Sequence, residues 1–89
     1  MENVIFDISE DAVLNLPRTL FYYKTEETLL VISPEQANWI ALFNEEQISI
    51  FSALLKQKTI GYLFKRFNEE NINFILGQII DREFLSKKK

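Results

Sequence analysis

The sequence predicts an α+β fold in which a three-stranded antiparallel sheet is followed by three helices. Residues 20–43 contain three short runs rich in aromatic and aliphatic residues, and polar turns separate these runs. From residue 44 onward the apolar residues recur at helical spacing, behind residues that favour helix starts. The chain of 89 residues has the size of one small domain.

The first three elements are predicted to be the strands of a meander. The run "LFYYK", residues 20–24, ends at the polar turn "TEE", and "TLLVI", residues 28–32, returns as the second strand of a hairpin. The turn "SPEQ" then leads into "NWIALF", residues 38–43, as the third strand. In this order the first and third strands form the two edges of the sheet.

The third strand is predicted to pass into the first helix without a loop. Asn44 is placed to cap this helix, and Gln47 is placed to complete a capping box. Phe43 and Ile48 have the spacing of a hydrophobic staple, which fixes the angle between the strand and the helix.

Two further helices follow the predicted caps Thr59 and Asn68. Each of the three helices carries an apolar stripe that we expect to face the core. The stripes are Ile48, Phe51, Leu54 and Leu55, then Ile60, Leu63, Phe64 and Phe67, and finally Ile72, Ile75, Leu76, Ile79 and Ile80.

The third strand lacks the residues that protect an open strand edge. Pro17, Arg18 and Lys24 flank the first strand, whereas "NWIALF" contains no proline and no charge. Such an edge suits strand addition by a peptide, whose side chains enter a groove between the third strand and a helix. Trp39, on this strand, is either a partly buried core side chain or a wall of that groove.

Composition narrows the chemistry of the domain. The chain has no cysteine and no histidine, which excludes disulfides, thiolate or imidazole metal sites and Cys/His catalysis. We therefore predict no metal, no cofactor and no enzymatic activity of the domain alone. No apolar run approaches the ~20 residues of a membrane span, and the acidic start "MENVIFDISED" is unlike a secretory signal, so a cytoplasmic protein without membrane contact is expected.

The order and spacing of these features resemble the PqqD-like family, the RiPP recognition elements that bind leader peptides of ribosomally made, modified peptides. The resemblance covers residues 20–85. It rests on a hairpin ending in "SPE", a strand leading into "LFNEEQ", "KTI" at the start of the second helix, and the spacing of Ile72, Leu76 and Ile79 before a terminal "FL". Phe84 is a departure, because the family often has glycine there.

The resemblance implies a winged helix-turn-helix-like domain whose third strand, beside the third helix, receives the leader peptide as an added strand. Such domains act alone or as the N-terminal part of a modifying enzyme, often a radical SAM maturase. The expected partners are therefore a precursor peptide and such an enzyme. The implied peptide-binding residues are Trp39, Ile40, Ala41, Leu42 and Phe43 on the strand, and Ile75, Gln78, Ile79 and Arg82 on the helix.

We expect the peptide-binding domain to span residues 19–85. Residues 1–18 form an N-terminal segment in which "VIFDI", residues 4–8, is a candidate short strand that would occupy the open edge itself. Residues 86–89 are expected to be a basic tail or the start of a linker.

Two alternatives share this architecture. A winged-helix DNA-binding regulator would use the third helix for recognition, but Glu69, Glu70, Asp81 and Glu83 outnumber Arg82 there and would repel DNA. Residues 47–89 nevertheless carry eight bases and four acids, with Lys56, Lys58, Lys65 and Arg66 around the second helix. The other alternative is a small adaptor or inhibitor that uses the same strand edge for another protein.

Overall fold

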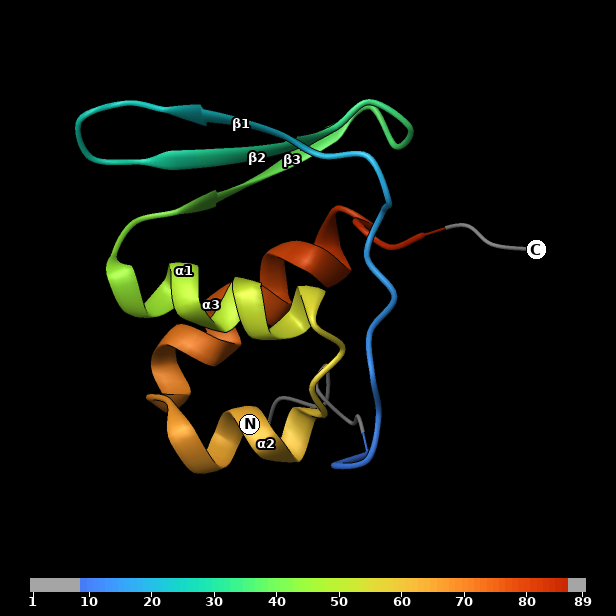
Figure 1. The fold of residues 1–89 in the computed structure, drawn as a ribbon, viewed down its shortest axis with the longest axis vertical. Coiled ribbons are helices and arrows are strands. Elements are labelled where there is room, and N and C mark those ends of the chain that lie inside the picture. The colour runs from blue at the N-terminus through green and yellow to red at the C-terminus, as the bar shows by residue number, and fades with distance from the viewer. Residues whose placement is uncertain (1–8, 87–89) are drawn as a thin grey trace.

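The computed structural model describes residues 9–86 and contains the predicted elements in the predicted order (Figure 1). The strands β1, β2 and β3 form one antiparallel sheet in that order, so the α+β fold is confirmed. The candidate strand at residues 4–8 lies outside the described residues. The elements are β1 (Phe21–Lys24), β2 (Leu29–Ser33), β3 (Asn38–Leu42), α1 (Glu45–Leu55), α2 (Ile60–Arg66) and α3 (Glu69–Asp81).

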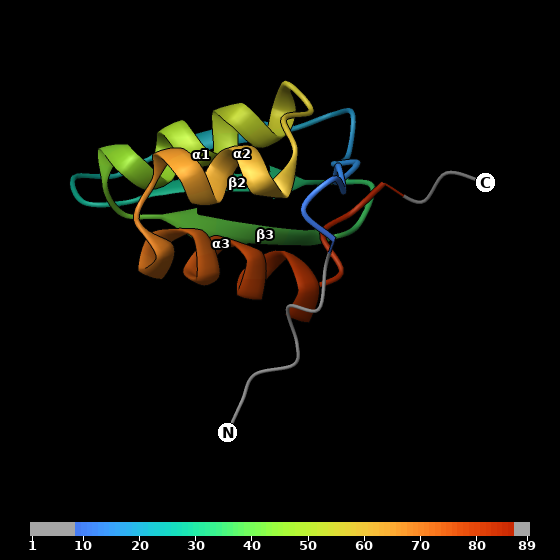
Figure 2. The same ribbon diagram turned by 90° about the horizontal axis from the view of Figure 1, so that it is seen from below.

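The sheet meets the helices through β3. In Figure 1 the strands lie above the helices, with β1 farthest from them, and in Figure 2 β3 lies between α1 on one side and α3 on the other. Burial follows this arrangement: all four residues of β1 are exposed, whereas β3 is buried from Ile40 to Leu42. One end of the sheet is thus part of the core, and the other extends from it.

The core joins the inner residues of β2 and β3 to the helical stripes. The prediction that the whole of each stripe faces the core is wrong for two residues, because Leu55 is 39% exposed and Phe64 is 41% exposed. Leu55 is the last residue of α1. In α2 only Ile60 and Leu63 are buried, so the buried stripe of this short helix does not extend to Phe64. The buried cluster is Val31, Ile40, Leu42, Ile50, Phe51, Ala53, Leu54, Ile60, Leu63, Ile72, Ile75, Leu76, Ile79 and Phe84.

The three predicted helix caps are confirmed by side-chain hydrogen bonds to free backbone donors. Asn44 Oδ1 accepts from the N–H of Gln47 at 2.8 Å. Thr59 Oγ1 accepts from the N–H of Tyr62 at 3.1 Å. Asn68 Oδ1 accepts from the N–H of Glu70 at 2.8 Å. Each cap satisfies a donor that the first helical turn leaves without an intrahelical partner.

Helix α3 ends in a Schellman motif that returns the chain to the core. The N–H of Phe84 donates to the C=O of Ile79 at 2.8 Å, and the N–H of Glu83 donates to the C=O of Ile80 at 3.2 Å. Glu83 takes a left-handed conformation, with φ of 51°, which glycine would adopt more easily. The turn directs Phe84 inward, where it is 0% exposed and fills the core.

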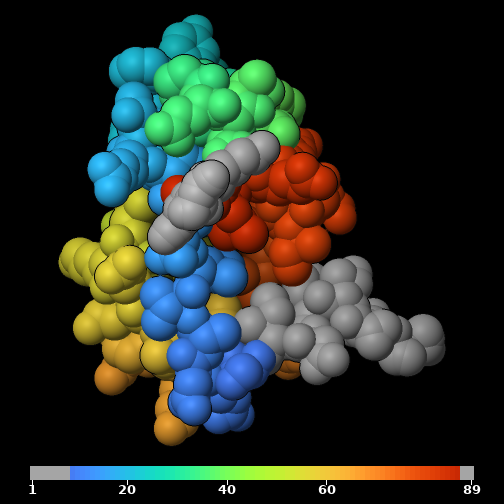
Figure 3. Space-filling view, turned by 90° about the vertical axis from the view of Figure 1, so that its right-hand side faces the viewer, coloured from blue at the N-terminus to red at the C-terminus, as the bar shows by residue number. Residues whose placement is uncertain are grey.

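The segment of residues 9–20 lies across the molecule and ties α2 to the rest of the chain. Figure 3 shows this segment in blue between the C-terminal parts of α1 and α3. The C=O of Glu10 accepts from the N–H of Gly61 at 2.9 Å, and the C=O of Ala12 accepts from the N–H of Ile60 at 3.0 Å. A Cβ at Gly61 would lie 3.2 Å from the Cβ of Glu10, so glycine allows this close approach.

We predict that Glu83→Gly stabilises the domain. Glycine removes the penalty of about 1 kcal/mol that an L-residue meets in the left-handed conformation. The free energy of unfolding, measured in urea, should rise by up to about that amount. Glu70→Gly is the matched control, because glycine within a helix should lower it by about 0.5–1 kcal/mol. A loss of stability in both variants would contradict the prediction.

Candidate functional site

The open edge of β3 presents the backbone groups of alternate residues. Val31 of β2 lies opposite Ile40, and Leu29 lies opposite Leu42. Because N–H and C=O groups alternate in direction along a strand, Ile40 and Leu42 face β2 and Trp39 and Ala41 face away from it. Hydrogen bonds from α3 to these last two residues, described below, agree with this assignment.

Gln78 of α3 makes both hydrogen bonds that Ala41 offers at this edge. Its side-chain Oε1 accepts from the N–H of Ala41 at 2.8 Å, and its Nε2 donates to the C=O of Ala41 at 2.8 Å. Ala41 is only 7% exposed, so without this partner its backbone would be poorly hydrated and unpaired. One side-chain amide therefore takes the place of a neighbouring strand.

Arg82, one helical turn further on, holds the first half of β3. Its Nη1 donates to the C=O of Trp39 at 2.8 Å, and its guanidinium carbon lies 4.0 Å from the centre of the Trp39 ring. The backbone C=O of Arg82 also accepts from Nδ2 of Asn38 at 2.7 Å. The remaining outward donor, the N–H of Trp39, is bonded to Oδ1 of Asn38 at 3.1 Å.

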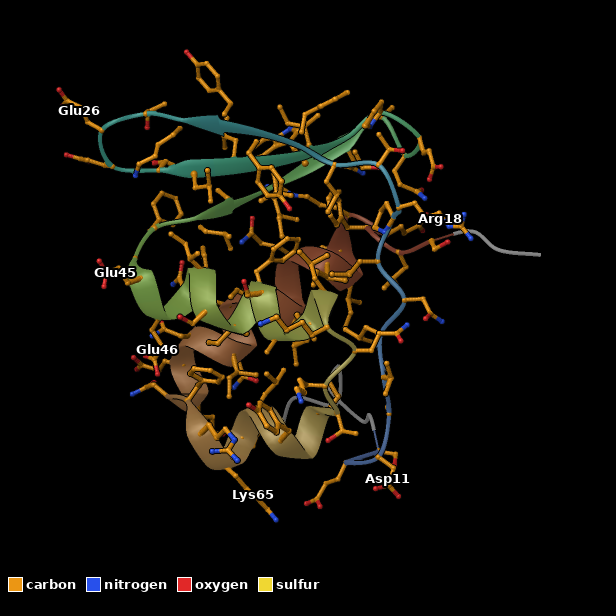
Figure 4. The ribbon with its side chains drawn as sticks, in the orientation of Figure 1. Asp11, Arg18, Glu26, Glu45, Glu46 and Lys65 are labelled. Carbon is orange, nitrogen blue, oxygen red and sulfur yellow. The ribbon has the colours of Figure 1, made fainter. Side chains whose placement is uncertain are left out.

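At the other end of β3, Gln47 links the strand to two helices. Its Oε1 accepts from the N–H of Phe43 at 2.8 Å, and its Nε2 donates to Oδ1 of Asn71 at 2.9 Å. The reciprocal bond of the predicted capping box thus goes to Phe43, one residue before the cap. Glu46 extends the network, since its two carboxylate oxygens accept from Asn71 at 2.6 Å and from the N–H of Asn68 at 2.8 Å, beside the start of α3 (Figure 4).

Exposed aromatic side chains mark the two ends of this edge. Trp39 is 44% exposed and lies under Arg82. Phe43 is 53% exposed, and its ring centroid lies 5.8 Å from that of Phe74 on α3. Phe74, Gln78 and Arg82 are spaced four residues apart, so they form one ridge of α3 along the edge of β3.

The structure places the nine predicted site residues in two groups. It brings Trp39, Ala41, Phe43, Gln78 and Arg82 together along the edge. Ile40, Leu42, Ile75 and Ile79 lie in the core, each at most 1% exposed, so these four contact no ligand while the core keeps this packing.

Sequence reasoning missed three residues of the site: Asn38, Gln47 as the partner of Phe43, and Phe74. For Phe74 a signal existed, because it lies one helical turn before Gln78 and two before Arg82. For the two amides no signal existed, since their partners depend on how the strand and helices pack.

The other parts of residues 9–86 contain weaker candidates for a functional site than the β3 edge. A hollow beside segment 9–20 is lined by Leu14, Leu16, Leu54, Gln57 and neighbouring residues, and β3 has no part in it. No group of three or more carboxylates in the described chain could hold a metal ion. None of the helices within residues 9–86 has the length and apolar character needed to cross a membrane.

Comparison with known proteins finds no matching family model, no matching curated protein and no matching solved structure. The resemblance to the PqqD-like family therefore remains a prediction, and the site stands on its geometry.

We predict that Gln47→Ala destabilises the domain by about 1–3 kcal/mol, because it leaves the N–H of Phe43 and Oδ1 of Asn71 without their partner. Gln47 is 6% exposed, so water replaces the lost bonds poorly. Gln57→Ala, at an exposed glutamine, is the control and should change the free energy of unfolding by less than about 0.5 kcal/mol. Equal effects of the two substitutions would show that the network around Gln47 contributes nothing.

Proposed function

We propose that this domain binds the leader region of a ribosomally synthesised precursor peptide by strand addition to β3, beside α3, and presents the rest of the precursor to a modifying enzyme. A radical SAM maturase is the enzyme class that the family resemblance suggests, and the cytoplasm is the proposed compartment. One observation carries the proposal: the outward backbone groups of β3 are bonded to side chains, which a peptide backbone can replace one for one.

Exchange of one hydrogen bond for another contributes little net free energy, so side chains must supply most of the affinity. Peptide residues opposite Trp39 and Phe43 lie four positions apart, and their side chains point to the same side of the sheet. On that side they meet Arg82 at one end and the Phe43–Phe74 pair at the other. We therefore propose a peptide with an acidic residue and an apolar residue four positions apart.

Binding of DNA through α3 has weaker support. Two residues that a recognition helix would turn outward, Gln78 and Arg82, are bonded to β3. The basic residues of the α2 region lie away from the sheet, as Lys65 shows in Figure 4, and Lys58 and Arg66 pack on the ring of Tyr62. An adaptor or inhibitor that uses the same edge would differ only in the identity of its partner.

The leader is tested with synthetic peptides from the N-terminal regions of short precursors encoded beside the gene. We expect one of them to bind more tightly than its scrambled version, in a fluorescence anisotropy titration. Preferential binding of an edge strand from a folded protein would favour the adaptor instead. Salt-dependent binding of arbitrary duplex DNA, with no peptide bound, would favour the regulator.

Proline substitutions in β3 should divide into two classes. Ile40→Pro and Leu42→Pro remove donors that face β2, so these variants should unfold. Trp39→Pro and Ala41→Pro remove donors that face the open edge, so they should bind the peptide less tightly. Trp39→Pro should keep its helical circular dichroism, whereas Ala41→Pro also displaces Gln78 and should lose stability. Fluorescence anisotropy on each folded variant measures the affinity.

Trp39→Val is the matched control for Trp39→Pro, because valine removes the indole but keeps the backbone donor and suits a strand. The proline variant should bind more weakly than the valine variant. If a folded Trp39→Pro protein and Trp39→Val bind with equal affinity, the peptide does not add to this edge.

Alanine scanning of the bound peptide should show that apolar positions dominate. The acidic position should contribute at most about fivefold in affinity, since exposed charge pairs are worth about 0–1 kcal/mol. This contribution should disappear in Arg82→Ala protein, whereas Lys65→Ala protein should keep it. A scan in which only charged positions matter would contradict the proposed mode of binding.

A further inference from the structure

The contact between Gln78 and Ala41 reproduces the bonding of an added strand. In an antiparallel sheet, a residue of a hydrogen-bonded pair donates its N–H to its partner and accepts from the same partner. Gln78 makes this pair of bonds through one primary amide, with both N···O distances at 2.8 Å. An amide side chain on a helix thus occupies the position of a peptide group at the middle of the candidate site.

We infer that Gln78 is a displaceable strand surrogate that closes the β3 edge in the free protein and sets the threshold that a peptide must exceed to bind. This inference rests on the proposed function, because it concerns what a peptide displaces at the same edge. A residue that merely lined the groove would strengthen peptide binding. A surrogate competes with the peptide and weakens binding.

The position of Gln78 makes this competition direct. Its helical neighbours on the ridge, Phe74 and Arg82, lie at the two ends of the edge, so a strand that pairs with both ends also passes Ala41. The peptide residue opposite Ala41 must then make both bonds that Gln78 gives up. Proline at that peptide position cannot donate, so the surrogate excludes peptides with proline there.

The same contact explains why an edge without proline or charge remains compatible with a monomer. An unpaired edge is a template for strands of other molecules, including a second copy of the chain. Ala41 lies midway between the outward-facing residues Trp39 and Phe43, and its backbone groups are those that a second β3 would need. A strand that pairs only through its backbone does not displace Gln78, whereas a peptide whose side chains also bind at both ends of the edge does.

The test compares wild-type protein with Gln78→Ala, and the probe is a fluorescein-labelled 12-residue peptide selected on wild-type protein from a random-sequence display library. We expect Gln78→Ala to bind this peptide about tenfold more tightly, the factor that one or two net hydrogen bonds represent. Gln57→Ala, at an exposed glutamine, should bind like wild type. Equal or weaker binding by folded Gln78→Ala overturns the inference.

Gln78→Glu is a second variant that tests the inference if the alanine variant unfolds. Its carboxylate still accepts from the N–H of Ala41 but no longer donates to the C=O. We expect an affinity between those of wild type and Gln78→Ala, and weaker binding than wild type would overturn the surrogate.

A measurement without peptide separates this inference from the proposed function. In wild-type protein the amide of Ala41 should be protected from hydrogen exchange, and in folded Gln78→Ala protein, which has no acceptor at this position, it should exchange at least tenfold faster, while the amide of Ile40 stays protected by β2. Equal Ala41 exchange in both proteins overturns the surrogate. If Trp39→Pro does not change peptide binding, the proposed function is wrong. The exchange result still tests the role of Gln78, because that measurement contains no peptide.

Discussion

A backbone donor and acceptor buried at an open strand edge must both be hydrogen-bonded, and the arrangement of this domain meets that requirement at Ala41. β3 enters the core between α1 and α3, which buries Ala41 while its N–H and C=O point away from β2. Gln78 pairs with both groups, and this fixes how α3 lies along the strand. Arg82 and Phe74 then fall at the two ends of the edge because helical spacing places them on the same ridge.

In the proposed site, the groups that pair with the peptide backbone differ from the groups that recognise the peptide side chains. In the proposed mode of binding, an extended peptide without proline opposite Ala41 replaces the bonds of the side-chain amide, but each replacement is nearly balanced in free energy. In this proposal the aromatic pair at one end and the stacked tryptophan and arginine at the other supply the contacts that depend on the peptide sequence. Core residues of the strand and helix, Ile40 and Ile79 among them, hold these groups at fixed distances without touching a ligand.

Local chemistry made the fold predictable, and long-range packing limited the prediction of the site. Asn44, Thr59 and Asn68 each bond to a donor two or three residues away, so their role is visible in the sequence. Gln78 and Arg82 bond to residues 37 and 43 positions away, and only the family resemblance suggested them. The apolar stripe of α3 placed Ile75 and Ile79 toward the core, where both are 0% exposed, whereas the family resemblance implied that they line the groove. The register between β2 and β3, which the sequence leaves open, decides which residues face outward.

The separation of Gln78 from Ala41 also bears on how the chain is made. Ribosomes release β3 before α3, and the contacts within the meander join residues close in sequence, so the sheet can form early. Until residue 78 has emerged, β3 has an edge that its own chain cannot close. Stalled or truncated chains that end before α3 would therefore expose an unpaired strand edge that can pair with other chains. Dependence on chaperones should fall once the last helix is complete.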